Sequence, residues 1–381
     1  MKILFCTSYF DNTYNGAGQF AQHLFRLNEK FPQHEIRVLS EDVKEAVRQF
    51  PNKFYSVTVS YPFFLKPLSM VLRAFSYHRQ AVKVKQSYQY DIIFYNNIFA
   101  AWWSALMFSN NTKVLGFIQD DSFIHYNLRS FRWTTSWLYR YFYHLAELIA
   151  ANLVDTVFSN SNYLKKEIES KYNIHPKKVK KIYLSIDIAN IAYCEALPIK
   201  TNETIKILFI KNNFQRGGLI ELVKATTLLS NKYRFKISVI GPLVTERDRI
   251  KTLFKDTNVE LDFRGNQSQS VVFQAFRTHH ILCIPSQKEA LGVANMEGLA
   301  HGIPIVATNV GGIPEVTKGN HCAWIAKPSN PKSLASAIRK CIESPVERLE
   351  KSLTGRKHVE THFNYHQMLT ETVTILENLS C

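Results

Sequence analysis

Short apolar runs alternate with longer segments of helical periodicity along almost the whole chain. The runs are rich in Ile, Val, Leu and Phe and have the length of strands that are buried on both faces. In the first half they occupy residues 2–8, 35–40, 91–97, 113–119, 155–161 and 180–185. In the second half they occupy residues 205–210, 235–241, 259–265, 280–286 and 303–309. This alternation predicts parallel α/β units rather than a β-sandwich or a helical bundle.

The pattern breaks once, near residues 188–204, where the periodicity is lost and Pro198 appears. Helical periodicity is clearest in residues 19–31, 133–151, 219–230 and 358–379. A chain of 381 residues also exceeds the roughly 250–300 residues that one hydrophobic core supports. We therefore expect one doubly wound domain in residues 1–190 and a second in residues 200–356. A C-terminal helix in residues 357–381 is expected to pack back on the first domain.

The most informative segment, residues 281–315, has the pattern of a strand, a loop, a helix, a strand and a Gly-rich loop. Glu289 lies in the loop after the first strand, and Glu297 follows in a helix that we expect to start near Gly292. Ligands of parallel α/β sheets bind beyond the carboxyl ends of the strands, so both carboxylates can face a cleft between the domains. Taken alone, two Glu near a helix start can simply complement its dipole.

The start of this helix offers a site for an anion. The amides of Leu291, Gly292 and Val293 lie where a helix leaves its N–H groups without internal acceptors and where its dipole favours negative charge. Gly292 also lets the backbone come close to a ligand. Carboxylates accept hydrogen bonds from sugar hydroxyls, whereas amides and a cation hold phosphates. The segment thus suits a sugar nucleotide part by part.

Residues 285–315, PSQKEALGVANMEGLAHGIPIVATNVGGIPE, closely resemble the Glu-x7-Glu donor-binding signature of the large retaining family of GT-B glycosyltransferases, the group 1 or family 4-like enzymes. The resemblance implies two Rossmann-like domains that face a central cleft, an N-terminal acceptor domain and a C-terminal nucleotide-sugar donor domain. It implies that Glu297 binds the ribose of the donor and that Glu289 contacts the transferred sugar at the catalytic centre. The amides at the helix start would contact the sugar or the diphosphate.

Two further segments resemble the same family less closely. Gly16 and Gly18, in NGAGQFAQHLFRL, are similar to the Gly-rich loop of the N-terminal domain, which implies a place near the donor phosphates. Two nearby glycines alone more often mark a turn than a site. Residues 159–187 resemble the last unit of the N-terminal domain before the hinge, and they support the fold more than the chemistry.

The loop FIKNNFQRGGL departs from the family pattern, which has an Arg and a Lys that grip the diphosphate. Arg216 can stand in for the Lys, although Gly217 can occupy the same place if the register moves by one residue. Lys211 and Asn212 lie where the Arg is expected. Either Arg216 or Lys211 can therefore hold the phosphates, and a surface cation without a role is the alternative. Gly241, after the next strand, completes the expected donor-binding set.

The strand KVLGFIQDD also departs from the family, which often has His-Asp at its end, with the His near the reacting sugar. Gln119 occupies the His position, and an amide can hydrogen-bond a sugar hydroxyl but cannot carry a proton. Asp120, our candidate catalytic carboxylate, or Asp121 can instead orient or deprotonate an acceptor hydroxyl. A carboxylate that only caps a helix is the alternative.

The resemblance implies that an acceptor hydroxyl displaces a nucleoside diphosphate from the anomeric carbon with retention, and that the departing phosphate serves as the base. We expect a hexosyltransferase of surface polysaccharide, lipopolysaccharide or glycolipid synthesis. No cofactor or metal is implied, because Asp120 and Asp121 are adjacent and form no DxD-like pair. The alternatives are a GT-B-fold sugar-nucleotide epimerase and a basic protein that binds membranes or polyanions and whose transferase site has decayed.

The net charge of the chain is +16, and two basic stretches of the first domain indicate a further partner. Residues 46–90 contain seven Lys or Arg and no acid, interleaved with Phe, Leu and Val. Residues 129–144 place three Arg among Trp, Tyr and Phe, again without a carboxylate. Such faces suit an anionic lipid surface, and a solvated basic face beside a core stripe is the alternative. No nucleic-acid-binding motif accompanies the charge, so we expect no nucleic-acid partner.

The remaining sequence features concern the cellular compartment. No apolar stretch approaches the ~20 residues that cross a bilayer, and the N-terminus has the pattern of a strand rather than a signal peptide. The six Cys show no CxxC spacing and are interpreted as reduced packing residues. We expect a cytoplasmic protein whose partners are a nucleotide-sugar donor and a glycan or lipid-linked acceptor. A peripheral place on the inner face of a membrane is a further hypothesis.

Overall fold

The structure, a computed structural model, describes residues 1–11, 16–62, 66, 68–108, 112–121 and 135–380. It divides into two compact units, of which unit 1 comprises Met1–Ser185 with His366–Cys381 and unit 2 comprises Ile186–Tyr365. Part of the aromatic stretch 129–144 that the sequence singles out, residues 129–134, lies outside the described residues. Within the described ranges, no helix is both long and apolar enough to cross a membrane.

Unit 1 is built on a parallel sheet with the strand order β3-β2-β1-β4-β5-β6-β7. Its strands are β1 (Lys2–Thr7), β2 (Glu35–Ser40), β3 (Phe54–Ser56), β4 (Ile92–Tyr95), β5 (Lys113–Ile118), β6 (Thr156–Ser159) and β7 (Val179–Lys181). The central strands are apolar on both faces because helices cover both sides of a parallel sheet. Their register pairs Phe5 of β1 with Val38 on one side and Phe94 on the other.

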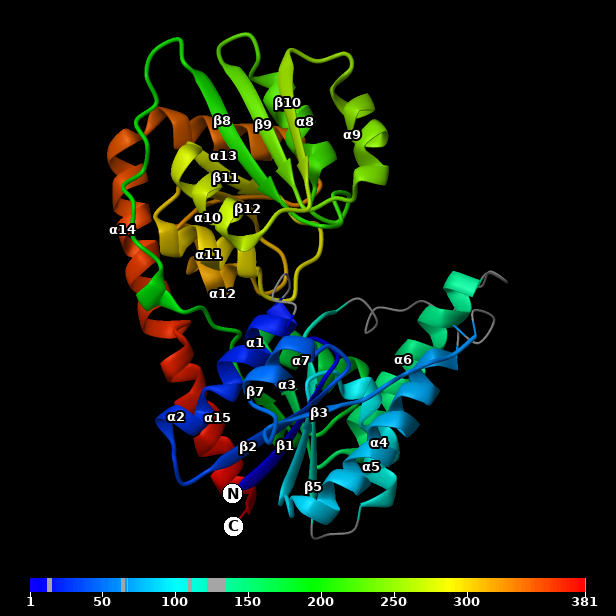
Figure 1. The fold of residues 1–381 in the computed structure, drawn as a ribbon. Coiled ribbons are helices and arrows are strands. Elements are labelled where there is room, and N and C mark those ends of the chain that lie inside the picture. Colours follow the sequence, from blue (N-terminus) through cyan, green and yellow to red (C-terminus); the bar gives the residue numbers. More distant parts are fainter. Residues whose placement is uncertain (12–15, 63–65, 67, 109–111, 122–134, 381) are drawn as a thin grey trace. The chain divides into compact units, whose positions relative to one another are not determined.

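The helices of unit 1 lie around the sheet (Figure 1). They are α1 (Gly16–Phe25), α2 (Leu27–Lys30), α3 (Lys44–Gln49), α4 (Ser69–Ser87), α5 (Trp102–Met107), α6 (Thr135–Leu153), α7 (Asn162–Lys171) and α15 (Tyr365–Ser380), with the 3-10 turns η2 (Ile98–Ala100) and η4 (Pro176–Lys178). A third 3-10 turn, η5 (Ile188–Asn190), belongs to unit 2. Helices α4, α5 and α6 pack on one another. Helix α15 is fastened to α2 because Lys30 Nζ donates to the carbonyl of His366 (2.7 Å) and to Thr370 Oγ1 (2.9 Å).

Unit 2 has a parallel sheet with the strand order β10-β9-β8-β11-β12-β13. Its strands are β8 (Thr204–Ile210), β9 (Arg234–Ile240), β10 (Val259–Gly265), β11 (Ile281–Ile284), β12 (Ile305–Thr308) and β13 (Trp324–Ala326). Its helices are α8 (Leu219–Leu228), α9 (Arg247–Phe254), α10 (Gln269–Thr278), α11 (Val293–His301), α12 (Ile313–Thr317), α13 (Pro331–Glu343) and α14 (Pro345–His362), with 3-10 turns η6 (Val244–Glu246) and η7 (Gly319–His321).

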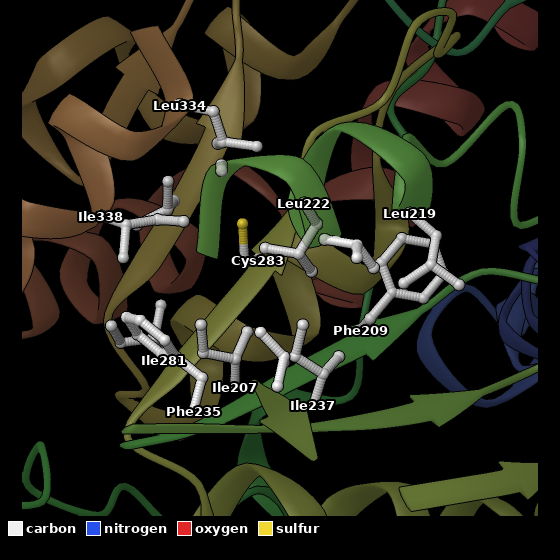
Figure 2. Packing of buried hydrophobic residues seen from close by; sticks show 14 of the residues in the cluster. Ile207, Phe209, Leu219, Leu222, Phe235, Ile237, Ile281, Cys283, Leu334 and Ile338 are labelled. Atoms are coloured by element: carbon white, nitrogen blue, oxygen red, sulfur yellow. The ribbon is translucent and has the colours of Figure 1, made fainter. Parts of the chain in front are cut away.

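The core of unit 2 lies between the central strands and helices α8 and α13. Figure 2 shows Leu334 of α13 above Cys283 of β11 and Ile338 of α13 to its left, with side chains of α8 and β8 nearby. Cys283 is fully buried, and this burial raises the pKa of its thiol well above the ordinary value. The thiol therefore acts as a small packing group.

Both sheets change winding direction between neighbouring central strands, β1 and β4 in unit 1 and β8 and β11 in unit 2. At such a switch point the connections diverge, and the edge formed by the carboxyl ends of the strands is open to a ligand. The prediction of an α/β protein with two doubly wound parallel sheets is confirmed. The sequence pattern missed the three-residue strands β3 and β13, which lie at sheet edges.

The predicted helix at residues 358–379 is in fact two helices, α14 and α15. The helical conformation ends at Phe363, where φ is −128° and ψ is 19°. The carbonyl of Phe363 accepts from the amide of Ile186 (2.9 Å), and the amide of Tyr365 donates to the carbonyl of Ile186 (3.2 Å). Pairing with a distant segment therefore replaces the helical hydrogen bonds at this point.

Candidate functional site

An ion pair joins two loops at the carboxyl edge of the sheet in unit 2. Lys211 directly follows β8, and its Nζ donates to Oε2 of Glu289, in the loop after the neighbouring strand β11. The Lys211 and Glu289 side chains are only 25% and 15% exposed, so the pair is shielded from much of the solvent. Ser286 Oγ also donates to Oε2 of Glu289 (3.5 Å). The structure thus brings together two predicted site residues that are 78 positions apart.

Two glycines allow the backbone to approach Lys211. Gly241, after β9, has φ +115°, and a Cβ there would lie 2.7 Å from the carbonyl carbon of Lys211 and 2.9 Å from the amide nitrogen of Asn212. A Cβ on Gly217 would lie 2.9 Å from the Cβ of Lys211. Any side chain at either position would have to displace Lys211, so the two glycines allow Lys211 to take its place beside Glu289. Asn212 itself is exposed beside them.

Arg216 lies against the segment that precedes Glu289. Its Nε donates to the carbonyl of Lys288 (3.2 Å), and its carbonyl accepts from the amide of Gln287 (2.9 Å). Its own amide donates to Asn213 Oδ1 (2.9 Å), which closes the turn before α8. The loop after β8 is therefore joined to the loop after β11 by Arg216 as well as by Lys211. Both cations that the sequence offered for the phosphate role lie at this edge.

The helix predicted to start near Gly292 begins at Val293, with Gly292 as its N-cap. Gly292 has φ +102°, a value that side-chain-bearing residues rarely adopt, whereas a Cβ there would meet only Asn295 Nδ2 closely, at 3.3 Å, and that side-chain atom can shift. Conformation rather than space therefore calls for glycine at this position. Leu291 is buried beneath the helix start, next to Gly312, where a Cβ would come within 2.9 Å of the Leu291 Cα. The first-turn amides of α11 therefore begin at Val293, directly after the closely packed backbone of Leu291 and Gly292.

Glu297 lies in the second turn of α11 and is 8% exposed. Its carbonyl accepts from His301 Nδ1 (2.8 Å), and the His301 ring packs against Phe273 and Phe276. Burial lowers the pKa of His301, so the ring is neutral at pH 7 and serves as a packing group. The part of α11 that carries Glu297 is therefore well packed against α10.

A set of neutral polar side chains follows four strands at the carboxyl edge of unit 1. Asn96, after β4, donates from Nδ2 to Thr7 Oγ1 at the end of β1 (3.0 Å). Gln119, after β5, donates from Nε2 to Oδ1 and to the carbonyl of Asn96. Asn160, after β6, donates from Nδ2 to the carbonyl of Gln119 (2.7 Å). We call these four residues the amide ladder, which crosses four adjacent strands.

Asn96 of the amide ladder also bonds to the start of α1, where Gly16 and Gly18 of the predicted Gly-rich loop lie. Asn96 Nδ2 donates to the carbonyl of Ala17 (2.9 Å), between Gly16 and Gly18 at the start of α1. Gly18 is buried and Gly16 is half-buried. Asn96 thus bonds both to Gln119 and to Ala17, the residue between the two glycines. The Nε2 group of Gln119 is engaged, and within the described residues only the Oε1 side of its amide is left to meet a ligand.

The two carboxylates after Gln119 have different environments. Asp120 is exposed, whereas Asp121 is 1% exposed and accepts from the Tyr163 hydroxyl (3.4 Å). Asp121 is therefore turned into the fold, and Asp120 is the one that solvent reaches. Asp120 also acts on Glu147 of α6, a buried carboxyl that accepts from the Tyr172 hydroxyl (2.6 Å). Burial raises the pKa of Glu147 to about 8, and the charge of Asp120 adds to the rise.

Several residues of these edges escaped the sequence reasoning. Asn96, Asn160 and Ser286 each stand directly after a strand or within two residues of its end, and this position was the available signal. Glu147 gave no signal because it is an ordinary Glu in an apolar helix. In the described part of the chain, no three His, Cys, Asp or Glu side chains cluster as metal ligands would.

Two family comparisons together cover most of the chain. Residues 195–357 match the family described as "Glycosyl transferases group 1". Residues 14–190 match the family described as "Glycosyltransferase Family 4". Each match covers somewhat less than half of the chain, and the C-terminal match contains the ion pair and helix α11.

Curated relatives match parts of the chain. The amylovoran biosynthesis glycosyltransferase AmsK of Erwinia amylovora is 26% identical over 188 residues, which are 47% of this chain and 46% of that protein. The capsular polysaccharide biosynthesis glycosyltransferase CapM of Staphylococcus aureus is 26% identical over 180 residues, which are 46% of this chain and 47% of that protein. The chain thus spans about half the length of these relatives.

Solved structures resemble the whole chain. Sucrose-phosphate synthase from Thermosynechococcus elongatus has a TM-score of 0.77 at 14% identity, with coverage of 100% of this chain and 99% of that one. HepE of Anabaena, in complex with UDP, has a TM-score of 0.73 at 16% identity, with coverage of 99% and 100%. At these identities the likeness shows the fold, which is that of GT-B glycosyltransferases. The two family matches and this fold agree, and the chain belongs to the group 1, family 4-like glycosyltransferases.

Proposed function

We propose that the protein transfers a sugar from a nucleoside-diphosphate sugar to an acceptor hydroxyl with retention of anomeric configuration. The observation that carries the proposal is the shielded Lys211–Glu289 pair beside the start of α11. A cation, a carboxylate and helix-terminal amides at one sheet edge are the groups that a diphosphate and a sugar hydroxyl require. The same edge contains Arg216, joined to the backbone of Lys288.

Each residue of this edge has a part in the reaction. The bond from the anomeric carbon to the diphosphate oxygen breaks, and the acceptor oxygen forms the new bond on the same face. The acceptor proton passes to the departing phosphate. Lys211, Arg216 and the amides of Gly292 and Val293 stabilise the charge on that phosphate, which is the main contribution of the protein. In the absence of donor, Lys211 and Glu289 neutralise each other, and a diphosphate competes for the ammonium group.

Two carboxylates are assigned to the donor's hydroxyl groups. Glu297 accepts from the ribose hydroxyls, because its position about one turn along α11 from the amides at the helix start suits the nucleoside end of the donor. Glu289 accepts from a hydroxyl of the transferred sugar once Lys211 turns to the phosphate. Leu291, Asn212 and Gly241 shape the pocket through the close backbone approaches described above.

The donor class and the process are supported by similar proteins. HepE of Anabaena has been solved with UDP, with UDP and glucose, and with UDP-glucose. AmsK and CapM are named for the biosynthesis of amylovoran and of capsular polysaccharide. We therefore propose a UDP-sugar or related nucleotide sugar as donor, without a metal or other cofactor, and a glycan or lipid-linked acceptor of surface polysaccharide synthesis. The acceptor is met at the cytoplasmic face of a membrane.

The acceptor side of the reaction is assigned to the edge of unit 1. Gln119 offers an amide carbonyl to an acceptor or donor hydroxyl, and Asp120 is the exposed carboxylate that can orient the attacking hydroxyl. Asp121 supports this strand end from within the fold through Tyr163. Gly16 and Gly18 place two residues without side chains at the start of α1, at the same edge.

A thermal-shift panel tests the proposal. UDP, GDP, ADP, CMP and their sugar conjugates are added to the wild type, to Glu297→Ala and to the control Glu350→Ala, which changes an exposed Glu of α14. At a hundredfold excess over Kd, one nucleotide should stabilise the wild type and the control by about 2.7 kcal/mol. Each shift is measured against the unliganded melting of the same variant. A panel without any shift, or an equal shift in Glu297→Ala, would refute the donor site.

A further inference from the structure

Helices α4, α5 and α6 of unit 1 carry a large share of the exposed apolar side chains among the described residues. Figure 1 shows the three helices side by side, and they pack on one another. Among the described residues, seven of the sixteen large apolar side chains that are exposed belong to these three helices. They are Val71, Phe75, Val82, Leu106, Met107, Ile149 and Leu153. Apolar exposure concentrated in this way marks a contact surface rather than chance.

The centre of this surface is a connected group from α4 and α5. Phe75 is 48% exposed, and its ring meets Trp103 edge to face at 5.9 Å. Trp103 in turn meets Trp102 at 5.1 Å. Leu106 and Met107, one turn further along α5, are 56% and 57% exposed. Trp beside protruding aliphatic side chains is the composition that proteins place at the boundary of lipid headgroups and acyl chains.

The charge of the same surface has one sign. Helices α4 and α5 contain no Asp or Glu, and the Glu147 of α6 is buried. Arg79 and Lys83 of α4 and Arg140 of α6 are exposed. The surface therefore combines apolar side chains with cations and offers no exposed carboxylate on the three helices, which is the complement of an anionic bilayer.

Helix α14 of unit 2 provides the internal contrast. It also exposes apolar side chains, at Val346, Leu349 and Leu353. Glu347 and Glu350 interleave with them, so carboxylates stand beside every apolar group of that face. An anionic lipid surface would repel these carboxylates. Exposed apolar groups alone therefore do not distinguish the two faces, whereas the combination with charge does.

We propose that the face formed by α4, α5 and α6 docks on an anionic lipid bilayer. Phe75, Leu106 and Met107 enter the boundary of headgroups and acyl chains, and Arg79 and Lys83 contact lipid phosphates. The protein thus lies on the bilayer without spanning it. The proposal specifies the face at which a membrane-presented acceptor is met. It concerns lipid binding alone, so its failure leaves the donor site of unit 2 untouched.

Vesicle co-sedimentation of the full chain tests the proposal. The wild type should bind phosphatidylcholine vesicles that contain phosphatidylglycerol, at low salt, and release them as salt rises. Leu106→Ser with Met107→Ser should weaken this binding at least about tenfold, since two apolar side chains no longer enter the bilayer. Arg79→Gln with Lys83→Gln should weaken it about tenfold and flatten its salt dependence.

The matched control is Leu349→Ser with Leu353→Ser, which removes two exposed apolar side chains from α14 and should leave binding unchanged. A nucleotide-induced thermal shift equal to that of the wild type shows that each variant is folded. Absence of wild-type binding at low salt overturns the proposal, as does an equal loss in the control. Vesicle-free sedimentation in which Leu106→Ser with Met107→Ser turns a dimer into a monomer also overturns it, because the face would then join two copies of the chain.

Discussion

The carboxyl edges of the two sheets both lie at a switch point of the strand order, but different side chains link their strand ends. In unit 2, a shielded ion pair between Lys211 and Glu289 links two loops, and Arg216 joins them a second time. In unit 1, the amide ladder from Thr7 to Asn160 links four strand ends without any charge. The linked side chains of unit 2 can respond to a charged ligand, whereas those of unit 1 are neutral, and the exposed carboxylate of Asp120 follows one of the same strands.

The difference follows from what each group costs to bury. A neutral amide needs only hydrogen-bond partners, and the NH2 group of each amide of the ladder donates to an acceptor at the end of a neighbouring strand. A buried charge needs an opposite charge or a ligand, and Lys211 and Glu289 supply each other with one. A doubly wound sheet therefore sets where a ligand binds, and the residues after its strands set which ligand that is.

The largest expected effect is on the charged edge. Lys211→Ala should lower kcat by roughly 10²–10³-fold, because a cation beside the leaving phosphate is lost from a partly desolvated site. The matched control is Lys232→Ala, which removes an exposed ion pair with Glu343 (2.6 Å) elsewhere in unit 2. Initial rates of sugar transfer measure the effect. Equal rates for both variants would show that Lys211 has no part in the reaction.

The second effect is on stability, through the close approach of Gly241 to the backbone of Lys211. Gly241→Ala should lower the free energy of unfolding by about 3 kcal/mol, since its Cβ would collide with the Lys211 backbone at a positive φ. Gly319→Ala, at φ +60° with nothing within 4 Å, should cost only about 1 kcal/mol. Urea unfolding compares the two. If both substitutions cost the same, the close approach at Gly241 carries no energy.

The third effect is on the amide ladder. Asn96→Ala should lower the free energy of unfolding by about 2 kcal/mol, because buried groups of Gln119, Thr7 and Ala17 lose their common partner. Asn152→Ala, which removes an exposed side-chain bond to the Leu148 carbonyl, is the control and should cost less than about 0.5 kcal/mol. Nucleotide affinity should be unchanged in both variants, so weaker nucleotide binding in Asn96→Ala would break the division of roles between the edges.

The last effect concerns a single carboxyl group of unit 1, that of Glu147. The pKa of Glu147 is raised to about 8, so the folded protein holds a proton that the unfolded chain releases above its ordinary pKa. Between these two values the free energy of unfolding should fall with rising pH, by up to about 1.4 kcal/mol per pH unit. Glu147→Gln should remove this slope while keeping the hydrogen bond from Tyr172. If the melting temperature of Glu147→Gln changes with pH as that of the wild type does, Glu147 is not neutral in the folded protein.

The sequence predicted the charged edge better than the neutral one, for a physical reason. The helix start at Gly292 depends on a local requirement for positive φ, and the spacing of Glu289 and Glu297 lies within one segment. The Lys211–Glu289 pair and the amide ladder depend on which strands become neighbours, and a local pattern does not contain that order. The break at Phe363 escaped for the same reason, since its cause is pairing with Ile186.

Hydrogen–deuterium exchange with and without the stabilising nucleoside diphosphate tests the central claim most directly, because it locates the donor on the chain. The account predicts that the largest protection appears in residues 286–297 and 210–218, around the ion pair and the start of α11. Peptides of the amide ladder should change less. Protection confined to the strand ends of unit 1, with none in residues 286–297, would contradict the assignment of the donor site to unit 2.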